Sequence, residues 1–401
     1  MVAIAACELT KNFGDVVAVQ GVDLEVAPGE FLVVLGPTGC GKSTLLRLLA
    51  GFEEPTAGRV LFDGVPVTEL DPRERNIAMV FQNFALYPHL TVAQNIGFPL
   101  RAAPAPGPEI GARVADVART VGIADLLNRY PEHLSGGQRQ RVAMARALVR
   151  RPAVFLLDEP LSNVDAGARA ALRGEIVALV RRLAVTTIYV THDQTEAMSM
   201  ADRIAVLRLG VLQQVGPPAE VYADPDTLFV AAFLGMPRTS LLEAAVYAED
   251  GKVVLDLGSQ VLELPPGDPR TARLAEHHTE RVTLALRALP LRARSPGISV
   301  RGTVRSVENL GHELLAHVDV GGVPSTRLDA PTPRSRPVAA STPYGFYPAY
   351  DLVEAPPTGE VMVRVPVPAR VRIGDELTVG MEPADLLLFD RAGRRIRFAA
   401  A

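Results

Sequence analysis

The chain has 401 residues, of which 48% are hydrophobic and 21% are charged, and its formal net charge is −4. This length predicts two or three domains, each able to bury its own core. The net charge argues against a nucleic-acid binder that works by broad electrostatic attraction. No apolar run approaches the length of a membrane span, and we expect no signal peptide. The two cysteines, Cys7 and Cys40, cannot form a disulfide framework, which fits a reducing, cytoplasmic compartment.

The first predicted elements in chain order are a strand, a glycine-rich loop and a helix. The apolar run at 31–35 is typical of a buried parallel strand, and residues 44–49 are typical of a helix. Only three of the 41 basic side chains belong to lysines, and one of them, Lys42, lies in the loop between these elements. The loop is a complete phosphate-binding motif, formed by Gly36, Pro37, Thr38, Gly39, Cys40, Gly41, Lys42, Ser43 and Thr44.

Each residue type in this loop has a physical reason. The glycines let the backbone turn tightly, so that its N–H groups converge on a β-phosphate at a helix N-terminus. We expect Lys42 to bridge the β- and γ-phosphates and the hydroxyl of Ser43 to ligate Mg²⁺. A chance glycine-rich turn is the alternative, but the strand–loop–helix context favours nucleoside triphosphate binding. The helix N-terminus would lower the pKa of the Cys40 thiol, although a small buried filler is the preferred interpretation of this residue.

A second helix start follows the predicted strand at 78–81 and its polar neighbour, Gln82. Ser135 is a candidate N-cap, and two glycines precede a strongly helical run at 138–150. This makes a second anion-binding helix terminus in one domain, although one nucleotide has only one triphosphate. The motif therefore suggests a site shared between two copies of the chain, to which each copy contributes Ser135, Gly136, Gly137 and Gln138.

Carboxylates and a histidine follow two more predicted strands, at 153–157 and 186–190. We expect Asp158 to hold the water shell of Mg²⁺ and Glu159 to polarise the attacking water as general base. We expect His192 to face the γ-phosphate from a neighbouring strand end. An acidic turn and a structural histidine are the alternatives, and the phosphate-binding loop upstream disfavours the first.

The residues after about 235 have a different pattern of predicted secondary structure. Before this point strands alternate with helices, including a predicted helix at 166–183, which is the pattern of an α/β fold. After about 240, short β runs separated by Gly- and Pro-bearing turns predict an all-β module of small-barrel type. A Pro-rich stretch at 324–358 is expected to be a long loop or an insertion.

The motifs, in this order, resemble the ATP-binding subunit of an ABC transporter. The resemblance covers nearly the whole chain and implies an ATPase core of the P-loop NTPase class at 1–235, with a helical subdomain at about 84–150. It implies a C-terminal OB-like regulatory domain at 236–401. It also implies ATP and Mg²⁺ as cofactors and a head-to-tail dimer around ATP. The family's motif residues, read onto this sequence, are the adenine-stacking Phe13, the Mg²⁺-sensing Gln82, the segment 162–165 with Asp165, and His192.

Two segments, 79–92 and 191–198, resemble bacterial importers of sugars and related solutes. This implies two transmembrane permease subunits that contact Asn83–Leu90, and indirectly an extracytoplasmic solute-binding protein. We expect Phe84 and Tyr87 to be exposed, and such aromatics would be unusual on a free surface. The alternative is that this loop packs on its own helical subdomain.

The tail resembles this subgroup's regulatory domain at 300–311 and 374–390, with two departures. Residues 287–289 are Arg-Ala-Leu where Arg-Pro-Glu is usual, and the Pro-rich stretch has no recognised counterpart. We therefore expect an ATPase that powers solute import, most simply of a sugar, from the cytoplasmic face of the plasma membrane, with no nucleic acid as partner. Glycerol-3-phosphate, polyol, sulfate, polyamine or iron import are alternatives, as is a non-transport ABC ATPase that acts as a mechanical binding module.

Overall fold

The computed structural model describes residues 1–101, 107–265, 267–268, 270–291, 298–325, 359–382 and 385–398. The chain divides by packing into two compact units, Met1–Ala219 and Glu220–Ala401. This division lies earlier than residue 235, where the composition changes, because residues from 220 onwards, including helix α8 (Leu228–Phe233), pack with the second unit. The Pro-rich stretch predicted at 324–358 lies, beyond Ser325, outside the described residues.

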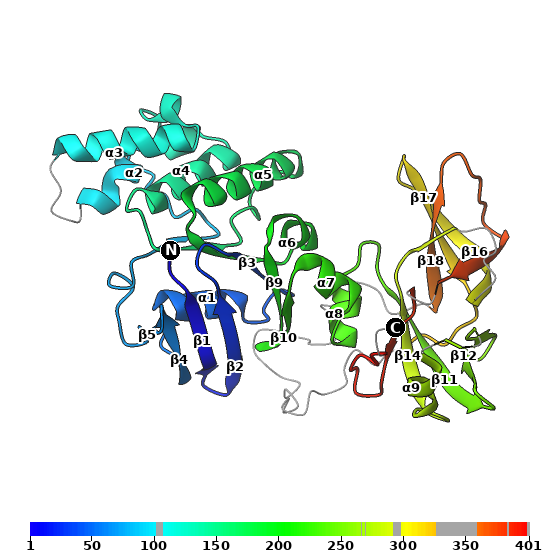
Figure 1. Ribbon diagram of the computed structural model, residues 1–401. Helices are drawn as coiled ribbons and strands as arrows, with labels where there is room; N and C mark the ends of the chain where they lie inside the picture. The colour runs from blue at the N-terminus through cyan, green and yellow to red at the C-terminus, as the bar shows by residue number, and fades with distance from the viewer. Residues whose placement is uncertain are drawn as a thin grey trace. The chain divides into compact units, whose positions relative to one another are not determined.

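The first unit contains two sheets (Figure 1). Four strands form one sheet in the order β2-β1-β4-β5, and their bounds are Ile4–Phe13 for β1, Val16–Val26 for β2, Ala57–Phe62 for β4 and Val65–Pro66 for β5. Six strands form the other in the order β10-β9-β3-β8-β7-β6, and their bounds are Phe31–Leu35 for β3, Ile77–Val80 for β6, Val154–Asp158 for β7, Thr186–Thr191 for β8, Arg203–Arg208 for β9 and Val211–Gly216 for β10.

The six-stranded sheet is parallel except at its edge strand β10. Every residue of β3, β7 and β8 is buried, which is the pattern of strands covered on both faces. The helices of this core are α1 (Lys42–Ala50), α5 (Ala166–Leu183) and α6 (Gln194–Met200). The strands predicted at 31–35, 153–157 and 186–190 and the helix predicted at 166–183 are therefore confirmed.

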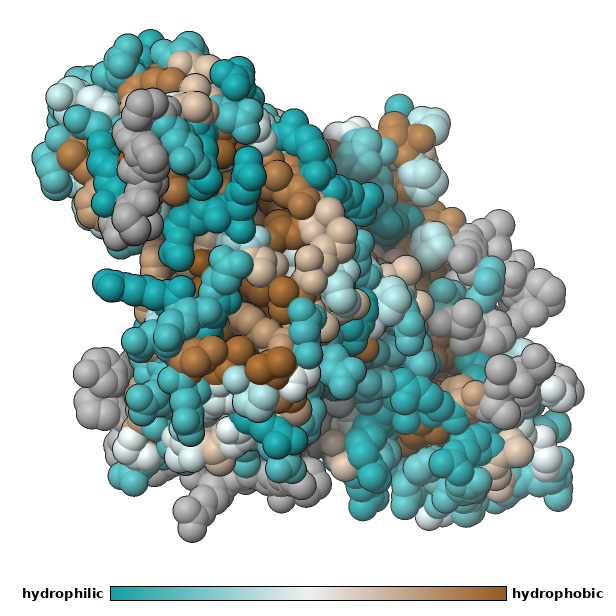
Figure 2. Space-filling view, turned by 60° about the vertical axis from the view of Figure 1, so that its left-hand side comes forward, coloured by the Kyte–Doolittle hydropathy of each residue, from teal (hydrophilic) through white to brown (hydrophobic). Residues whose placement is uncertain are grey.

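Helices α2 (Val92–Arg101), α3 (Gly107–Thr120) and α4 (Gly136–Leu148) lie together as a helical layer of the first unit (Figure 1). Two short 3₁₀ segments, η1 (Ala124–Leu126) and η2 (Pro131–His133), connect α3 to α4. The layer has its own apolar core, to which Ile96, Val114 and Val142 contribute. In the space-filling view apolar side chains gather in a hollow between this layer and the sheets of the same unit (Figure 2).

The second unit is β-rich, as predicted, and contains two five-stranded sheets around one apolar core. The first has the order β13-β12-β11-β14-β20, formed by β11 (Ser240–Glu249), β12 (Lys252–Asp256), β13 (Val261–Glu263), β14 (Arg281–Leu286) and β20 (Leu387–Phe389). The second has the order β15-β18-β17-β16-β19, formed by β15 (Leu289–Pro290), β16 (Ile298–Asn309), β17 (Glu313–Asp319), β18 (Glu360–Pro366) and β19 (Glu376–Met381). The unit is not purely β, because it also holds α8 and α9 (Arg270–Ala275), and α7 (Pro218–Ala223) spans the division.

Candidate nucleotide-hydrolysing site

Four neighbouring parallel strands bring the predicted catalytic residues to one edge of the sheet. The phosphate-binding loop follows β3, His192 follows β8, Asp158 ends β7, and Gln82 lies two residues after β6. These strands are adjacent in the order β3-β8-β7-β6, and carboxyl ends of parallel strands meet at the same edge. The sheet topology therefore brings these predicted residues to one edge of the sheet.

The phosphate-binding loop needs glycine at two positions for different reasons. Gly41 caps α1 in a left-handed conformation with a φ of 104°, and a side chain there would meet the carbonyl oxygen of Ala18. Gly36 has no room for a Cβ, which would lie 2.6 Å from the Sγ of Cys40. The loop is thus packed against its surroundings as well as turned, which fixes the N-terminus of α1 where an anion would bind.

Lys42 is the first residue of α1 and only 4% exposed. Its Nζ donates to the carbonyl oxygens of Gly36 at 2.9 Å and Pro37 at 2.8 Å, which curls the side chain back over the loop. An Oε1 of Glu159 lies 3.8 Å from the same nitrogen. An ammonium has three donors, so this lysine is held in the loop while a donor remains for a ligand phosphate.

Ser43 and Asp158 form a pair of hard oxygen ligands. The Ser43 hydroxyl donates to Oδ1 of Asp158 at 2.8 Å, and the carboxylate is largely buried. Burial raises the pKa of Asp158 above its usual value, and the hydrogen bond from Ser43 opposes that rise. Among the residues that the structure describes, no three His, Cys, Asp or Glu side chains gather as a metal cage. A single carboxylate with a hydroxyl suits Mg²⁺, which is typically held by few protein ligands together with substrate phosphates.

Glu159 and His192 form an acid–base pair beside Lys42. Oε2 of Glu159 lies 3.1 Å from Nδ1 of His192. This hydrogen bond is the main reason that the pKa of Glu159 is lowered and that of His192 is raised. Glu159 has a φ of 43°, a left-handed conformation that is costly for a residue with a side chain, and its N–H donates to the carbonyl of Val190 at 3.0 Å. The backbone therefore fixes the position of this residue at the strand end, and the hydrogen bond with His192 favours the ionised carboxylate.

The predicted second helix terminus begins α4. The Ser135 hydroxyl accepts from the N–H of Gln138 at 3.3 Å, and the Gln138 side chain accepts from the N–H of Ser135 at 3.0 Å, which is a complete capping box. In the described part of the chain no hydrogen bond or ion pair joins residues 135–138 to the phosphate-binding loop. The two helix termini that the sequence predicts to bind anions therefore belong to separate elements, α1 and α4.

Three other predicted residues have local structural partners. Phe13 ends β1, is 46% exposed and has the Nζ of Lys11 4.9 Å from its ring centroid. Asp165 is the N-cap of α5, where its carboxylate accepts from the N–H of Ala168 at 2.9 Å. The expectation of a lowered Cys40 pKa is wrong, because burial raises the pKa of this thiol to about 11. The interpretation of Cys40 as a small buried filler agrees with its burial.

The segment after Gln82 is packed more tightly than the sequence suggests. The expectation of an exposed Phe84 is wrong, since this side chain is buried. Tyr87 is partly buried, with its ring centroid 4.5 Å from that of Phe98 in α2. This loop therefore packs at least in part on its own helical layer, which is the alternative considered above.

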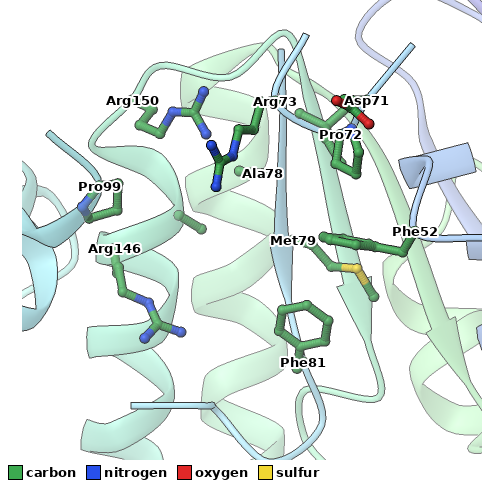
Figure 3. A pocket seen from close by; sticks show the side chains of 12 residues that line it. Phe52, Asp71, Pro72, Arg73, Ala78, Met79, Phe81, Pro99, Arg146 and Arg150 are labelled. Carbon is green, nitrogen blue, oxygen red and sulfur yellow. The ribbon is translucent and has the colours of Figure 1, made fainter. Parts of the chain in front are cut away.

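A pocket of about 590 Å³ lies beside this segment (Figure 3). Phe52, Met79 and Phe81 form an apolar side, and the rings of the two phenylalanines are 5.9 Å apart. Arg146 and Arg150 point in from the side of α4 (Figure 3). The pocket thus combines an apolar wall with positive charge.

Three residues that support the site escaped the sequence analysis. Arg75 is buried and donates to four carbonyl oxygens, two of them, Leu48 and Leu49, at the C-terminal end of α1. Asn95, which is fully buried, bonds both the N–H and the carbonyl of Tyr87. Arg146 binds the carbonyls of the 84–85 turn. No motif marks these residues, although a polar Asn inside the apolar stripe of α2 was a usable signal.

Comparisons with known proteins identify the family of this chain. Residues 19–162 match the family model described as ABC transporter. The trehalose/maltose import ATP-binding protein MalK of Thermococcus litoralis is 49% identical over 336 residues, which are 80% of this chain and 90% of that protein. The chain belongs to the ATP-binding proteins of ABC importers. The sn-glycerol-3-phosphate import ATP-binding protein UgpC of Cereibacter sphaeroides is 42% identical over 99% of this chain and all of that protein.

A solved structure also resembles part of this chain. It is cbiO1 from Clostridium perfringens, part of the ABC transporter complex cbiONQ, with a TM-score of 0.52 and 32% sequence identity. The similarity covers 55% of this chain and 90% of that one. No helix in the described ranges is both long and apolar enough to cross a membrane.

Proposed function

We propose that this ABC ATPase powers uptake of a sugar, or of glycerol-3-phosphate, through two permease subunits at the cytoplasmic face of the membrane. The observation that carries the catalytic part is the convergence of Lys42, the Ser43–Asp158 pair and the Glu159–His192 pair at one sheet edge. ATP hydrolysis needs a phosphate clamp, a cation site and a base for water, and these three groups supply them. The identities of the relatives support the solute class.

In this proposal each group has one task. Lys42 neutralises charge on the phosphates, and Glu159, kept ionised by His192, accepts a proton from the attacking water. Ser43 and Asp158 would hold Mg²⁺, with Gln82 at the neighbouring strand end, and the ion would neutralise charge between the β- and γ-phosphates.

The catalytic assignment is tested by Glu159→Gln, which keeps the shape of the side chain and removes the base. We expect kcat for ATP hydrolysis to fall by about 10²–10⁴-fold while ATP still binds. Glu132→Gln is the matched control, because Glu132 is an exposed carboxylate 3.8 Å from another histidine, His133. Hydrolysis by Glu159→Gln at the wild-type rate would show that Glu159 is not the base.

The nucleotide site is proposed to be completed by a second, head-to-tail copy whose residues 135–138 cover the same ATP, with Asp165 nearby. The support is the capped α4 terminus, which none of the described phosphate-loop residues contacts through a hydrogen bond or an ion pair. Glu159→Gln with Mg-ATP should sediment as a dimer, and adding Ser135→Arg should return it to a monomer. Ser135→Thr retains a capping hydroxyl and is the control. ATP-independent sedimentation of all three would contradict the shared site.

Adenine stacking is proposed for Phe13, which is exposed at the end of β1. Phe13→Ala should raise KM for ATP more than it lowers kcat, and Phe13→Tyr should restore KM. A KM unchanged by Phe13→Ala would remove this residue from the site.

Permease contact is proposed for Asn83–Leu90 and the adjacent pocket. Its apolar wall and its arginines fit a protein partner better than a small polar solute. Co-purification from membranes with two hydrophobic subunits, together with loss of labelled maltose or glycerol-3-phosphate uptake on gene deletion, would support import and identify the solute. Recovery with ribosomes or DNA instead would indicate a non-transport ATPase.

A further inference from the structure

We propose that Arg146 and Asn163 are positioning residues that join the 82–87 segment to the start of α4, so that a displacement of this segment moves residues 135–138. The functional importance of this link rests on the proposed function, because the permease is what would displace the segment. The link itself is a property of the first unit and is argued from its contacts alone.

Arg146 holds the middle of the 82–87 segment. Its Nη1 donates to the carbonyl oxygen of Ala85 at 2.7 Å and its Nη2 to that of Phe84 at 3.0 Å. The guanidinium carbon lies 5.6 Å from the ring centroid of Tyr87. A planar fork can reach two neighbouring carbonyls at once, which a single ammonium cannot do. Burial lowers the pKa of this guanidinium, which shows that the charged group loses part of its hydration. The contacts with the two carbonyls offset that loss.

The turn needs such a clamp because its backbone is in an unfavourable conformation. Phe84 and Ala85 both have left-handed φ values, of 60° and 47°. Two consecutive non-glycine residues in this region are strained, because a Cβ there lies too close to the backbone. The contacts with Arg146 therefore select this conformation of the segment.

Asn163 holds the beginning of the segment from a different element. Its Nδ2 donates to the carbonyl oxygen of Gln82 at 2.8 Å. Asn163 lies in the 162–165 turn before α5, and this turn packs directly on the start of α4. A Cβ on Gly136 would lie only 3.1 Å from the carbonyl oxygen of Asn163. Residues 135–138 are therefore in close contact with the turn that holds Gln82.

These contacts form a closed circuit. It runs from Gln82 to Asn163, across the close packing to Gly136, along α4 to Arg146 and back to the 84–85 turn. Helix α4 has 13 residues and spans about 20 Å at the usual rise per residue. A helix with regular hydrogen bonds transmits displacement along its axis, and the circuit is tied at both of its ends. The segment and the α4 terminus therefore shift together.

The circuit can be measured by hydrogen exchange on the full-length protein, without any permease. We expect Arg146→Lys to speed amide exchange about tenfold in peptides that cover 82–87 and, by a smaller factor, in peptides that cover 134–139. Asn163→Ala should also speed amide exchange in both sets of peptides, because it removes the bond to Gln82. The side chain is exposed, so this change carries little risk of unfolding. Arg150→Ala is the matched control, because Arg150 lines the same pocket and makes neither bond to the turn.

The double variant separates a circuit from two local anchors. In a circuit the effects of Arg146→Lys and Asn163→Ala on exchange at 134–139 are less than multiplicative, since either change opens the same loop of contacts. Faster exchange at 82–87 with wild-type exchange at 134–139 would overturn the proposal and leave Arg146 a local anchor.

The same variants test the functional consequence in membranes that contain the permease subunits. Arg146→Lys should lower kcat of the assembled transporter several-fold with less than a twofold change in KM for ATP. A fall in kcat only through a raised KM would contradict positioning. If Glu159 proves not to be the catalytic base, the hydrogen-exchange results stay as expected. A failure of the proposed function can therefore be distinguished from a failure of this proposal.

Discussion

Arg75 shows how the nucleotide site depends on a residue with no catalytic task. Its side chain is 4% exposed and donates from Nη1 to the carbonyls of Leu48 and Leu49 at 2.9 and 3.0 Å. Nε and Nη2 donate to the carbonyls of Leu70 and Thr68 at 2.9 and 2.7 Å. Arg75 thus closes the C-terminal end of the helix whose first residue is Lys42.

Arg75→Ala removes the donor for these four carbonyls. A buried acceptor without a partner costs about 1–3 kcal/mol. The carbonyl of Leu48 keeps a second partner, the N–H of Gly51 at 3.2 Å, and water entering the vacated space restores part of the rest. We therefore expect the free energy of unfolding of the first unit to fall by about 3 kcal/mol. For a unit of this size that corresponds to a Tm lower by about 6–12 °C.

Differential scanning calorimetry of the full chain measures this shift, because the two units can give separate transitions. Arg73→Ala is the matched control, since Arg73 is an exposed arginine two residues away, and it should change stability by less than about 0.5 kcal/mol. A loss below about 1 kcal/mol for Arg75→Ala would refute the reasoning that these hydrogen bonds hold α1 in place.

Three further predictions concern the site. Cys40, with its pKa near 11, should react with iodoacetamide at pH 8 at about a hundredth of the rate of a free thiol or less, and stoichiometric labelling of native protein would contradict its burial. The raised pKa of His192 and lowered pKa of Glu159 stabilise the fold most between about pH 4.5 and 6.5; the effect is lost as pH rises through the folded pKa of His192 or falls through that of Glu159. The Tm difference between wild type and His192→Gln should therefore be largest near pH 5.5 and shrink by pH 9, and a flat difference would argue against the pair. Ser135→Ala should lower stability by about 1 kcal/mol in thermal unfolding through loss of the capping box, whereas Ser135→Asn should keep most of it.

Much of the site could be predicted because it is encoded in short stretches of sequence. The phosphate-binding loop needs its own glycines, lysine and serine, and Asp158 and Glu159 follow directly from an apolar run. Parallel strands end at one edge, so residues far apart in the chain meet once their strands are recognised. The burial of Phe84 and of the Cys40 thiol was harder to predict, because it depends on which elements pack over them.

The sequence by itself thus predicted the parts of the site, which are a triphosphate-binding loop, a pair of oxygen ligands for a cation, a base and a second helix terminus, because each is encoded in neighbouring residues. Only the tertiary structure decided how these parts are held. Arg75, Asn95 and Arg146 act on carbonyl groups that lie 4 to 62 positions away in the chain. A buried side chain that satisfies distant backbone groups leaves no local pattern, because its partners are chosen by packing and not by spacing.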